Sequence, residues 1–417
     1  MADDAVSKSR RQPQPASRPA SQSELDARLS GRAFLKNQAL VIATFAVFWL
    51  LGSGQSLAQN AYITNAGSNN VSVIDTATNT VIATIQVGNT PQGVAVTPDG
   101  SRAYITNLVS NTVSVIDTST NTVIATIPAE VNPFGVAAAP DGKKVYVANI
   151  HGTDVLVIDT QTNTVTATIP VPNNIYGLAV TPDSTKVYAA SLGFDEVLVI
   201  DTATNMVTAT IPIGSRPLGV TVSPDGRKVY ITSPQSATNA HANLVYVIDT
   251  ATNTVIATVQ VDDGPMGVAV SPDGRKVYVG NTFSTTVSVI DTTTNTVIST
   301  IPAGNNPDGV ALTPDGSRVY VANDGSNTTS MINAATNTVT ATIPVGSNPV
   351  AFGIFIQPPA PAPLPPRFAG TPGKANCHGQ SVSALAKQYG GLNNAAATLG
   401  YSSVSALQNA IMEFCEG

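Results

Sequence analysis

Short apolar runs recur at a fixed spacing along residues 59–357 and are separated by polar turns. In the second copy they cover residues 93–96, 103–106, 113–116 and 123–127. Each run has the length of a β-strand, and no stretch between the runs has the 3.6-residue period of an amphipathic helix. The pattern predicts units of four short antiparallel strands.

The unit occurs seven times. A Val-Ile-Asp-Thr element marks each copy, with its acid at Asp75, Asp117, Asp159, Asp201, Asp249 and Asp291, and Asn333 at the equivalent position of the seventh copy. The copies are 42 residues apart except between Asp201 and Asp249, where the spacing is 48. Four-stranded units of this length are typical of β-propeller blades.

The two ends of the repeat region are offset by one strand. The first copy opens at Tyr62 without a preceding Gly-Val-Ala-Val strand, and the last copy is followed by an extra strand at 351–356. Pairing of this strand beside residues 61–64 would leave no blade with an open edge. We therefore expect an all-β, closed, seven-bladed β-propeller of four-stranded antiparallel blades, completed by the C-terminal strand.

The strands that begin with tyrosine carry a recognisable motif. Residues 320–323 read Tyr-Val-Ala-Asn and residues 104–107 read Tyr-Ile-Thr-Asn. These repeats resemble the YVTN family of seven-bladed propellers, found in exported and cell-surface proteins of bacteria and archaea, over residues 60–357. The resemblance is specific for fold. For function it implies a binding or surface protein, although related propellers also occur as lyases or as parts of redox enzymes.

Composition agrees with β-structure. The chain is 42% hydrophobic and only 11% charged, and its 50 threonines favour strands over long helices. Residues 59–357 carry twenty acidic and ten basic side chains, a net charge of −10. Binding of nucleic acid requires a basic surface, so it is not expected. We expect most of these carboxylates to be simply solvated; weak attraction of cations or basic partners is the other interpretation.

Residues 1–58 are interpreted as a disordered n-region followed by a signal peptide. The charge-free run 39–51 has the length of a secretory h-region and is short for a membrane span. Small residues at Ser56 and Ala58 predict cleavage after Ala58, which would leave no stable membrane span. Residues 30–36 resemble the twin-arginine export motif with Gly31 in place of the first arginine. General secretion is therefore the preferred route, and an uncleaved anchor is the minor alternative.

Antiparallel strand order assigns the loops to two faces. The Pro-Asp-Gly and Asp-Thr-x-Thr-Asn turns share one face, called here the turn face, and are nearly identical among copies. The inter-blade loops and the loops between second and third strands share the other, the variable face. We hypothesise that a ligand binds there, near the axis, although drift without a ligand would look similar. The candidate residues are Phe134, Tyr176, Arg216, Met266 and Asp308 from the inter-blade loops, and His151, His241 and Asp324 from the other loops.

The motifs of common catalytic and cofactor sites are missing from the sequence. Only His151 and His241 lie in the repeats, two blades apart, so a multi-histidine metal or haem site is not expected. We predict no metal and no cofactor, and read the repeated aspartates as turn caps. A non-catalytic protein is the preferred interpretation. The alternatives are a propeller lyase, with His241 as the catalytic candidate, and an accessory subunit of a periplasmic oxidoreductase.

A second, smaller unit follows the repeats. Residues 358–366 form a proline-rich linker of polyproline type. Residues 367–417 have apolar positions at helical spacing and are bracketed by the only two cysteines, Cys377 and Cys415, which predicts a small helical module tied by a disulfide. Such a module would serve attachment or partner docking.

These features predict a monomeric, exported protein located in the periplasm or at the cell surface. Its expected partner is a protein or another component of the cell envelope. The identity of that partner is beyond the sequence.

Overall fold

The computed structural model describes residues 59–172, 174–214, 216–234, 243–358, 377–389, 391–393, 395 and 404–416. The predicted signal peptide with its cleavage after Ala58, most of the proline-rich linker and His241 lie outside these residues.

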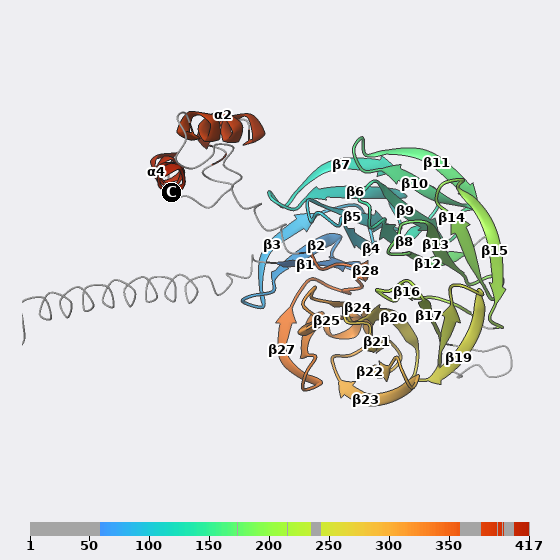
Figure 1. The fold of residues 1–417 in the computed structure, drawn as a ribbon. Helices are drawn as coiled ribbons and strands as arrows, with labels where there is room; N and C mark the ends of the chain where they lie inside the picture. The colour runs from blue at the N-terminus through green and yellow to red at the C-terminus, as the bar shows by residue number, and fades with distance from the viewer. Residues whose placement is uncertain are drawn as a thin grey trace, which may run out of the picture. The chain divides into compact units, whose positions relative to one another are not determined.

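The repeats form seven sheets around one axis, with the first strand of each full blade innermost (Figure 1). Blades one to four contain β1 (Asn60–Asn65), β2 (Asn70–Asp75), β3 (Thr80–Gln86); β4 (Pro91–Val96), β5 (Arg102–Asn107), β6 (Thr112–Asp117), β7 (Thr122–Pro128); β8 (Pro133–Ala138), β9 (Lys144–Asn149), β10 (Asp154–Asp159), β11 (Thr164–Pro170); and β12 (Ile175–Val180), β13 (Lys186–Ser191), β14 (Glu196–Asp201), β15 (Met206–Pro212). Blades five to seven contain β16 (Val220–Val222), β17 (Lys228–Ser233), β18 (Leu244–Asp249), β19 (Thr254–Gln260); β20 (Pro265–Val270), β21 (Lys276–Asn281), β22 (Thr286–Asp291), β23 (Thr296–Pro302); and β24 (Pro307–Leu312), β25 (Arg318–Asn323), β26 (Thr328–Asn333), β27 (Thr338–Pro344). Within each blade neighbouring strands are antiparallel, so the predicted all-β, seven-bladed propeller is confirmed.

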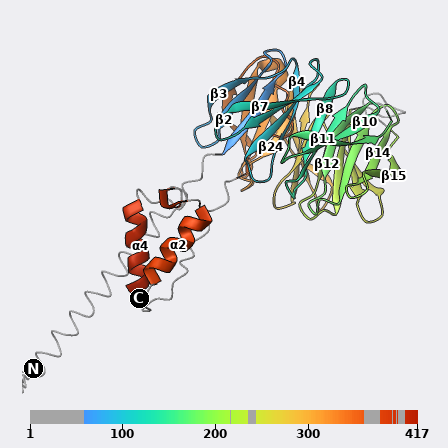
Figure 2. The ribbon, with the colours of Figure 1, turned by 90° about the horizontal axis from the view of Figure 1, so that it is seen from above.

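The core lies between the blades. Second and third strands are buried along most of their length because both of their faces pack against neighbouring blades, and their Val, Ile and Tyr side chains fill the gaps. The seven repeat tyrosines are all fully buried: Tyr62, Tyr104, Tyr146, Tyr188, Tyr230, Tyr278 and Tyr320. Figure 2 shows the blades edge-on.

The turn face links one blade to the next. In its Asp-Thr-x-Thr-Asn turn, Oδ1 of Asp249 accepts hydrogen bonds from the backbone N–H groups of Ala251 and Thr252, at 3.0 and 2.9 Å. Asn333 caps the seventh copy in the same way. Basic residues from the preceding blade reach these turns; Nζ of Lys228, for example, donates to the carbonyl of Thr292 over 2.7 Å. The turn aspartates are structural caps, as predicted.

The C-terminal strand closes the ring on the first blade, as the offset of the repeats predicts. Ile356 bridges Ala61 in antiparallel register, and the N–H of Tyr62 donates to the carbonyl of Phe355 over 2.9 Å. Phe355 and Ile356 are buried in the core shared by the first and last blades.

The closing segment also departs from a simple fourth strand. Pro349 and Ile356 are seven positions apart, whereas the equivalent Pro91 and Val96 of blade two are five apart. This surplus of two residues lets β28 (Phe352–Ile354) turn inward, where it pairs in parallel with β4 of the second blade.

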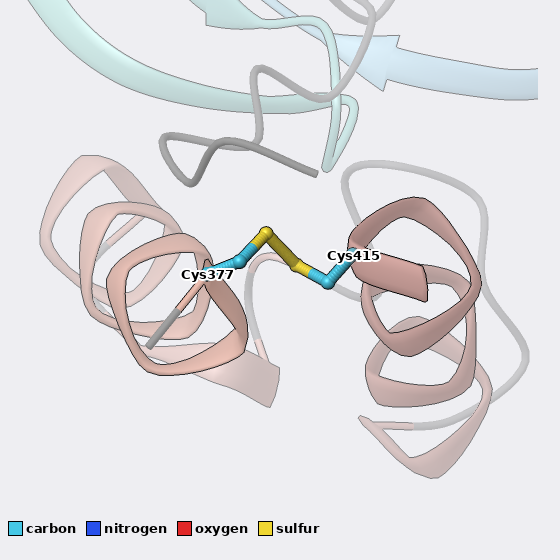
Figure 3. Close-up of a disulfide and its surroundings, with 2 residues drawn as sticks. All are labelled: Cys377 and Cys415. Atoms are coloured by element: carbon cyan, nitrogen blue, oxygen red, sulfur yellow. A yellow bond between two sulfur atoms is a disulfide. The ribbon is translucent and has the colours of Figure 1, made fainter. Parts of the chain in front are cut away.

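The C-terminal module contains α2 (Cys377–Tyr389) and α4 (Val404–Glu416), joined by the predicted Cys377–Cys415 disulfide (Figure 3). Leu385, Leu407 and Ile411 are fully buried in its small core. Within the described part of the chain, no helix combines the length and the apolar character needed to cross a bilayer.

Candidate functional site

Glycines hold the first strands close together around the axis. A Cβ atom on Gly135 would lie 2.0 Å from the carbonyl oxygen of Tyr176 in the next blade, and one on Gly267 would lie 2.1 Å from that of Asp308. No side chain fits at such a distance, so these positions require glycine. The six residues that precede these glycines, together with Val350 before Ala351 at the equivalent position of the closing segment, form a ring near the axis on the variable face. This ring is called here the inner ring: Gln92, Phe134, Tyr176, Leu218, Met266, Asp308 and Val350.

Threonine side chains of the second strands also hold the backbone of the inner ring through hydrogen bonds. Oγ1 of Thr106 donates to the carbonyl of Phe134 over 2.6 Å and accepts from the N–H of Gly93 over 2.8 Å. Thr232 bridges Met266 and its own blade's glycine in the same manner. The backbone of the inner ring is thus held by hydrogen bonds, while its side chains are free to differ.

A second ring lies beside the first. It consists of the residues that follow the second strands: Ala66, Leu108, Ile150, Leu192, Pro234, Thr282 and Asp324. Apart from Pro234, which has no N–H, each member donates a backbone hydrogen bond to an inter-blade loop; the N–H of Asp324, for example, donates to the carbonyl of Asn306 over 2.9 Å. Side chains of the two rings lie close together in blade three, where Phe134 and Ile150 share one hydrophobic cluster, and in blade seven, where the charge of Asp324 acts on Asp308.

Aromatic residues fill part of the inner ring. The ring centroids of Phe134 and Tyr176 are 5.1 Å apart, and those of Phe134 and Phe352 are 5.3 Å apart. Phe134 is buried by these contacts together with Ile150 and Val350, whereas Tyr176 stays half-buried. Burial raises the pKa of Tyr176, and the nearby Arg216 charge partly offsets this. The sequence analysis named Phe134 and Tyr176 as candidate site residues but did not name Phe352. The feature of the sequence that could have indicated Phe352 is the two extra residues between Pro349 and Ile356.

Asp308 is the one residue of the inner ring with a carboxyl group. Only 7% of the residue is exposed, and its Oδ1 atom is buried without a hydrogen-bond partner. Burial, reinforced by the negative charge of Asp324, raises the pKa of Asp308 to about 7. The inner-ring and second-ring pairs of the other six blades are uncharged. Blade seven alone places two carboxyl groups there.

The remaining predicted site residues are more dispersed. Met266 is half-buried beside Asp308 in the inner ring, and Arg216 is exposed. His151 is exposed, with Nδ1 at 2.7 Å from Oδ1 of Asn132. Among the described residues, no group of three or more His, Cys, Asp or Glu side chains is arranged to hold a metal ion.

Exposed apolar side chains surround the rings. Phe194 and Phe283 are 59% and 66% exposed, and Val109 and Val131 are 58% and 48% exposed. All four lie in loops of the variable face. Elsewhere in the described propeller, the large exposed apolar residues belong to the outermost strands or to the closing strand.

Charge is divided unequally between the two faces. The strand ends place twelve acidic and nine basic residues of the propeller on the turn face, but eight acidic and one basic on the variable face, a net charge of −3 against −7. The described ion pairs, Lys143–Asp141 and Arg275–Asp273, both lie on the turn face. The charged residues of the variable face are Glu130, Asp154, Asp195, Glu196, Asp262, Asp263, Asp308, Asp324 and Arg216.

A pocket of about 390 Å³ lies on the axis toward the turn face. Its walls are Val, Ala and Leu side chains of the innermost strands, with prolines of the Pro-Asp-Gly turns at the rim. Gly353 and Ile354 of the closing strand also line it, and Ile354 is 68% exposed. The sequence prediction, which placed the site on the opposite face, did not include this pocket.

The closed ring of seven antiparallel sheets defines a seven-bladed β-propeller. The model of the YNCE-like beta-propeller family matches residues 38–355, and the chain belongs to that family. The expected membership of a seven-bladed propeller family is thereby confirmed.

Similar solved structures share this architecture. A chain of Kuenenia stuttgartiensis hydrazine synthase is 26% identical with a TM-score of 0.61, and the match covers 66% of this chain and 92% of that one. A functionally unknown protein from Desulfotomaculum acetoxidans is 18% identical with a TM-score of 0.60, covering 71% and 100%. Dihydro-heme d1 dehydrogenase NirN, solved in complex with DHE, is 17% identical with a TM-score of 0.54, covering 70% and 64%. The last two likenesses show the fold alone.

Among curated proteins, the PE-PGRS family protein PE_PGRS18 of Mycobacterium tuberculosis is 64% identical over 39 residues. The match spans 9% of this chain and 8% of that protein. It is about the length of one blade, so it concerns the repeat and not the whole molecule.

Proposed function

We propose that this protein is an exported, non-catalytic propeller that binds a protein or another cell-envelope component at its variable face. One observation carries the proposal: this face combines exposed apolar loop tips with carboxylates that form no part of the repeated turn caps. Exposed Phe and Val side chains grouped on one face are typical of interaction surfaces. The charged residues of the turn face, in contrast, mostly cap turns or link blades.

The positions of the two ends of the propeller also support binding at the variable face. The carbonyl of Gln59 accepts from the N–H of Thr76 over 2.9 Å, and Nε2 of Gln357 donates to the carbonyl of Gly100 over 2.8 Å. Both ends of the propeller therefore leave it on the turn face. A propeller attached to the envelope through either end would have its variable face free for a partner. We propose a monomer in the periplasm or at the cell surface.

The proposal is tested by capture from a solubilised envelope fraction with a loop-tip variant, Phe194→Ser with Phe283→Ser. The matched control is Ile256→Ser with Ile298→Ser, since these outer-strand side chains are 51% and 50% exposed. We expect wild type and control to retain the same partner and the loop-tip variant to lose it, with unchanged melting temperatures. Equal capture by all three proteins would contradict binding at the variable face.

A second candidate function is an accessory role in a periplasmic oxidoreductase. The similarity to a chain of hydrazine synthase supports it. Optical spectra and metal analysis of protein purified from its native envelope test this alternative. A stoichiometric haem or metal would favour it over the non-catalytic proposal.

A further inference from the structure

The net negative charge of the propeller is concentrated on the variable face, whose carboxylates do not cap the repeated turns. On the turn face, hydrogen bonds from Thr252 hold the pKa of Asp249 below its usual value, which is the behaviour of a structural cap. The variable face carries a net charge of −7. Such a face attracts positively charged partners and repels anionic lipid surfaces and nucleic acid.

The buried carboxyl group of Asp308 lies within this acidic face. Oδ1 of Asp308 is buried without a hydrogen-bond partner, and an unsatisfied buried polar group costs free energy. Gly280 and Thr282 of blade six line its backbone: a Cβ on Gly280 would lie 2.5 Å from the carbonyl oxygen of Asp308, and Thr282 donates to the carbonyl of Pro307. Together with Asp324, Asp308 offers a pair of acceptors suited to an ammonium or guanidinium group.

We propose that the partner of the variable face is a basic polypeptide, one of whose lysine or arginine side chains binds to Asp308 and Asp324. This inference rests on the proposed function and specifies its partner. A polypeptide is favoured over a small amine because the exposed side chains of Phe194 and Phe283 lie in loops outside the inner ring and require a partner broad enough to cover them.

The pH dependence follows from the surroundings of Asp308. Asp324 is the charged group near it; Met266 on β20, Thr282 after β21, and Val350 on the closing segment are uncharged, and the charged residues of β21 and β25 lie at the opposite ends of those strands. A cation binds the ionised carboxylate. Because the pKa of Asp308 is about 7, affinity should increase as the pH rises through that value.

The test measures binding of a fluorescent peptide of alternating lysine and alanine by anisotropy. Two double variants carry the same change of charge: Asp308→Asn with Asp324→Asn on the variable face, and Asp249→Asn with Asp291→Asn on the turn face. Asn333 shows that asparagine caps these turns, so the control should fold normally. We expect the variable-face variant to bind about tenfold more weakly or worse, and the control within about twofold of wild type.

The same experiment includes two further measurements, the dependence of peptide binding on salt and on pH. Binding to wild type should weaken as salt is added, and Asp308→Asn should remove the dependence on pH near 7 while its melting temperature stays at or above that of wild type. Failure of the peptide to bind wild type, or equal weakening in both double variants, would overturn the inference. If loop-tip residues still govern capture from the envelope in that case, the proposed function stands and only the basic partner is wrong.

Discussion

At the scale of single residues, the glycines of the first strands decide whether the inner ring can form. Replacement of Gly135 by alanine would place a Cβ 2.0 Å from the carbonyl oxygen of Tyr176, and backbone atoms must move to relieve the clash. We expect a loss of about 3 kcal/mol in the free energy of unfolding, the upper part of the range for overpacking. Denaturant titration with urea measures it.

Gly142 provides the control. A Cβ there meets nothing within 4 Å, but its φ of +73° disfavours alanine by about 1 kcal/mol. A Gly135→Ala variant no less stable than Gly142→Ala would show that the close approach between blades is unimportant.

The sequence placed Phe134, Tyr176, Met266 and Asp308 on the variable face near the axis, but did not show how deeply they are buried. These residues were candidates because the loops of the variable face differ from copy to copy, whereas the turns of the turn face are nearly identical. The burial of Phe134 depends on the closing segment, which brings Phe352 and Val350 against it from far along the chain. The order of residue types within each repeat does not show contacts between segments that are far apart along the chain.

At the scale of elements, the strands of the repeated blades could be predicted from the sequence, whereas the position of β28 could not. The four-stranded units could be predicted because polar turns separate the apolar runs in every copy. The inward turn of β28 depends on two extra residues that only matter once Pro349 and Ile356 are both held by blade one. The length of the segment between two fixed ends allows this detail, and Gly353, with a φ of +122°, allows the close approach of β28 to Val94 of β4.

The helix pair α2 and α4 depends on its disulfide. Four fully buried side chains, Leu385, Ala395, Leu407 and Ile411, form the centre of its core, which is small for independent stability. Closure of a 38-residue loop contributes about 4 kcal/mol in the chain-entropy model. Replacing both cysteines by serine should therefore lower the unfolding temperature of the helices, followed by circular dichroism at the helical minimum. Met412→Ala, at a 45% exposed site, is the control, and equal melting of both variants would contradict the expectation.

At the scale of the whole molecule, the two faces have separate tasks. The turn face repeats because each turn caps itself and binds the next blade, so a change in one copy weakens two blades. Loops of the variable face are held by repeated backbone hydrogen bonds, such as that from Asp324 to Asn306, so the side chains of the inner ring can differ from blade to blade. This division explains how a chain with only 11% charged residues still presents one distinctly acidic face.

Closure makes the seven blades interdependent, and a substitution in the closing strand tests this. Phe355 is fully buried between the first and last blades, so Phe355→Ala should cost about 3–5 kcal/mol. Because the strand joins the two ends of the ring, we expect the midpoint of global unfolding to fall and hydrogen exchange to accelerate in blade four as well as in blade one. Ile354→Ala, in the same segment but 68% exposed, should leave both unchanged. Faster exchange confined to blades one and seven, with an unaltered midpoint, would mean that the blades unfold as separate units, as in an open solenoid.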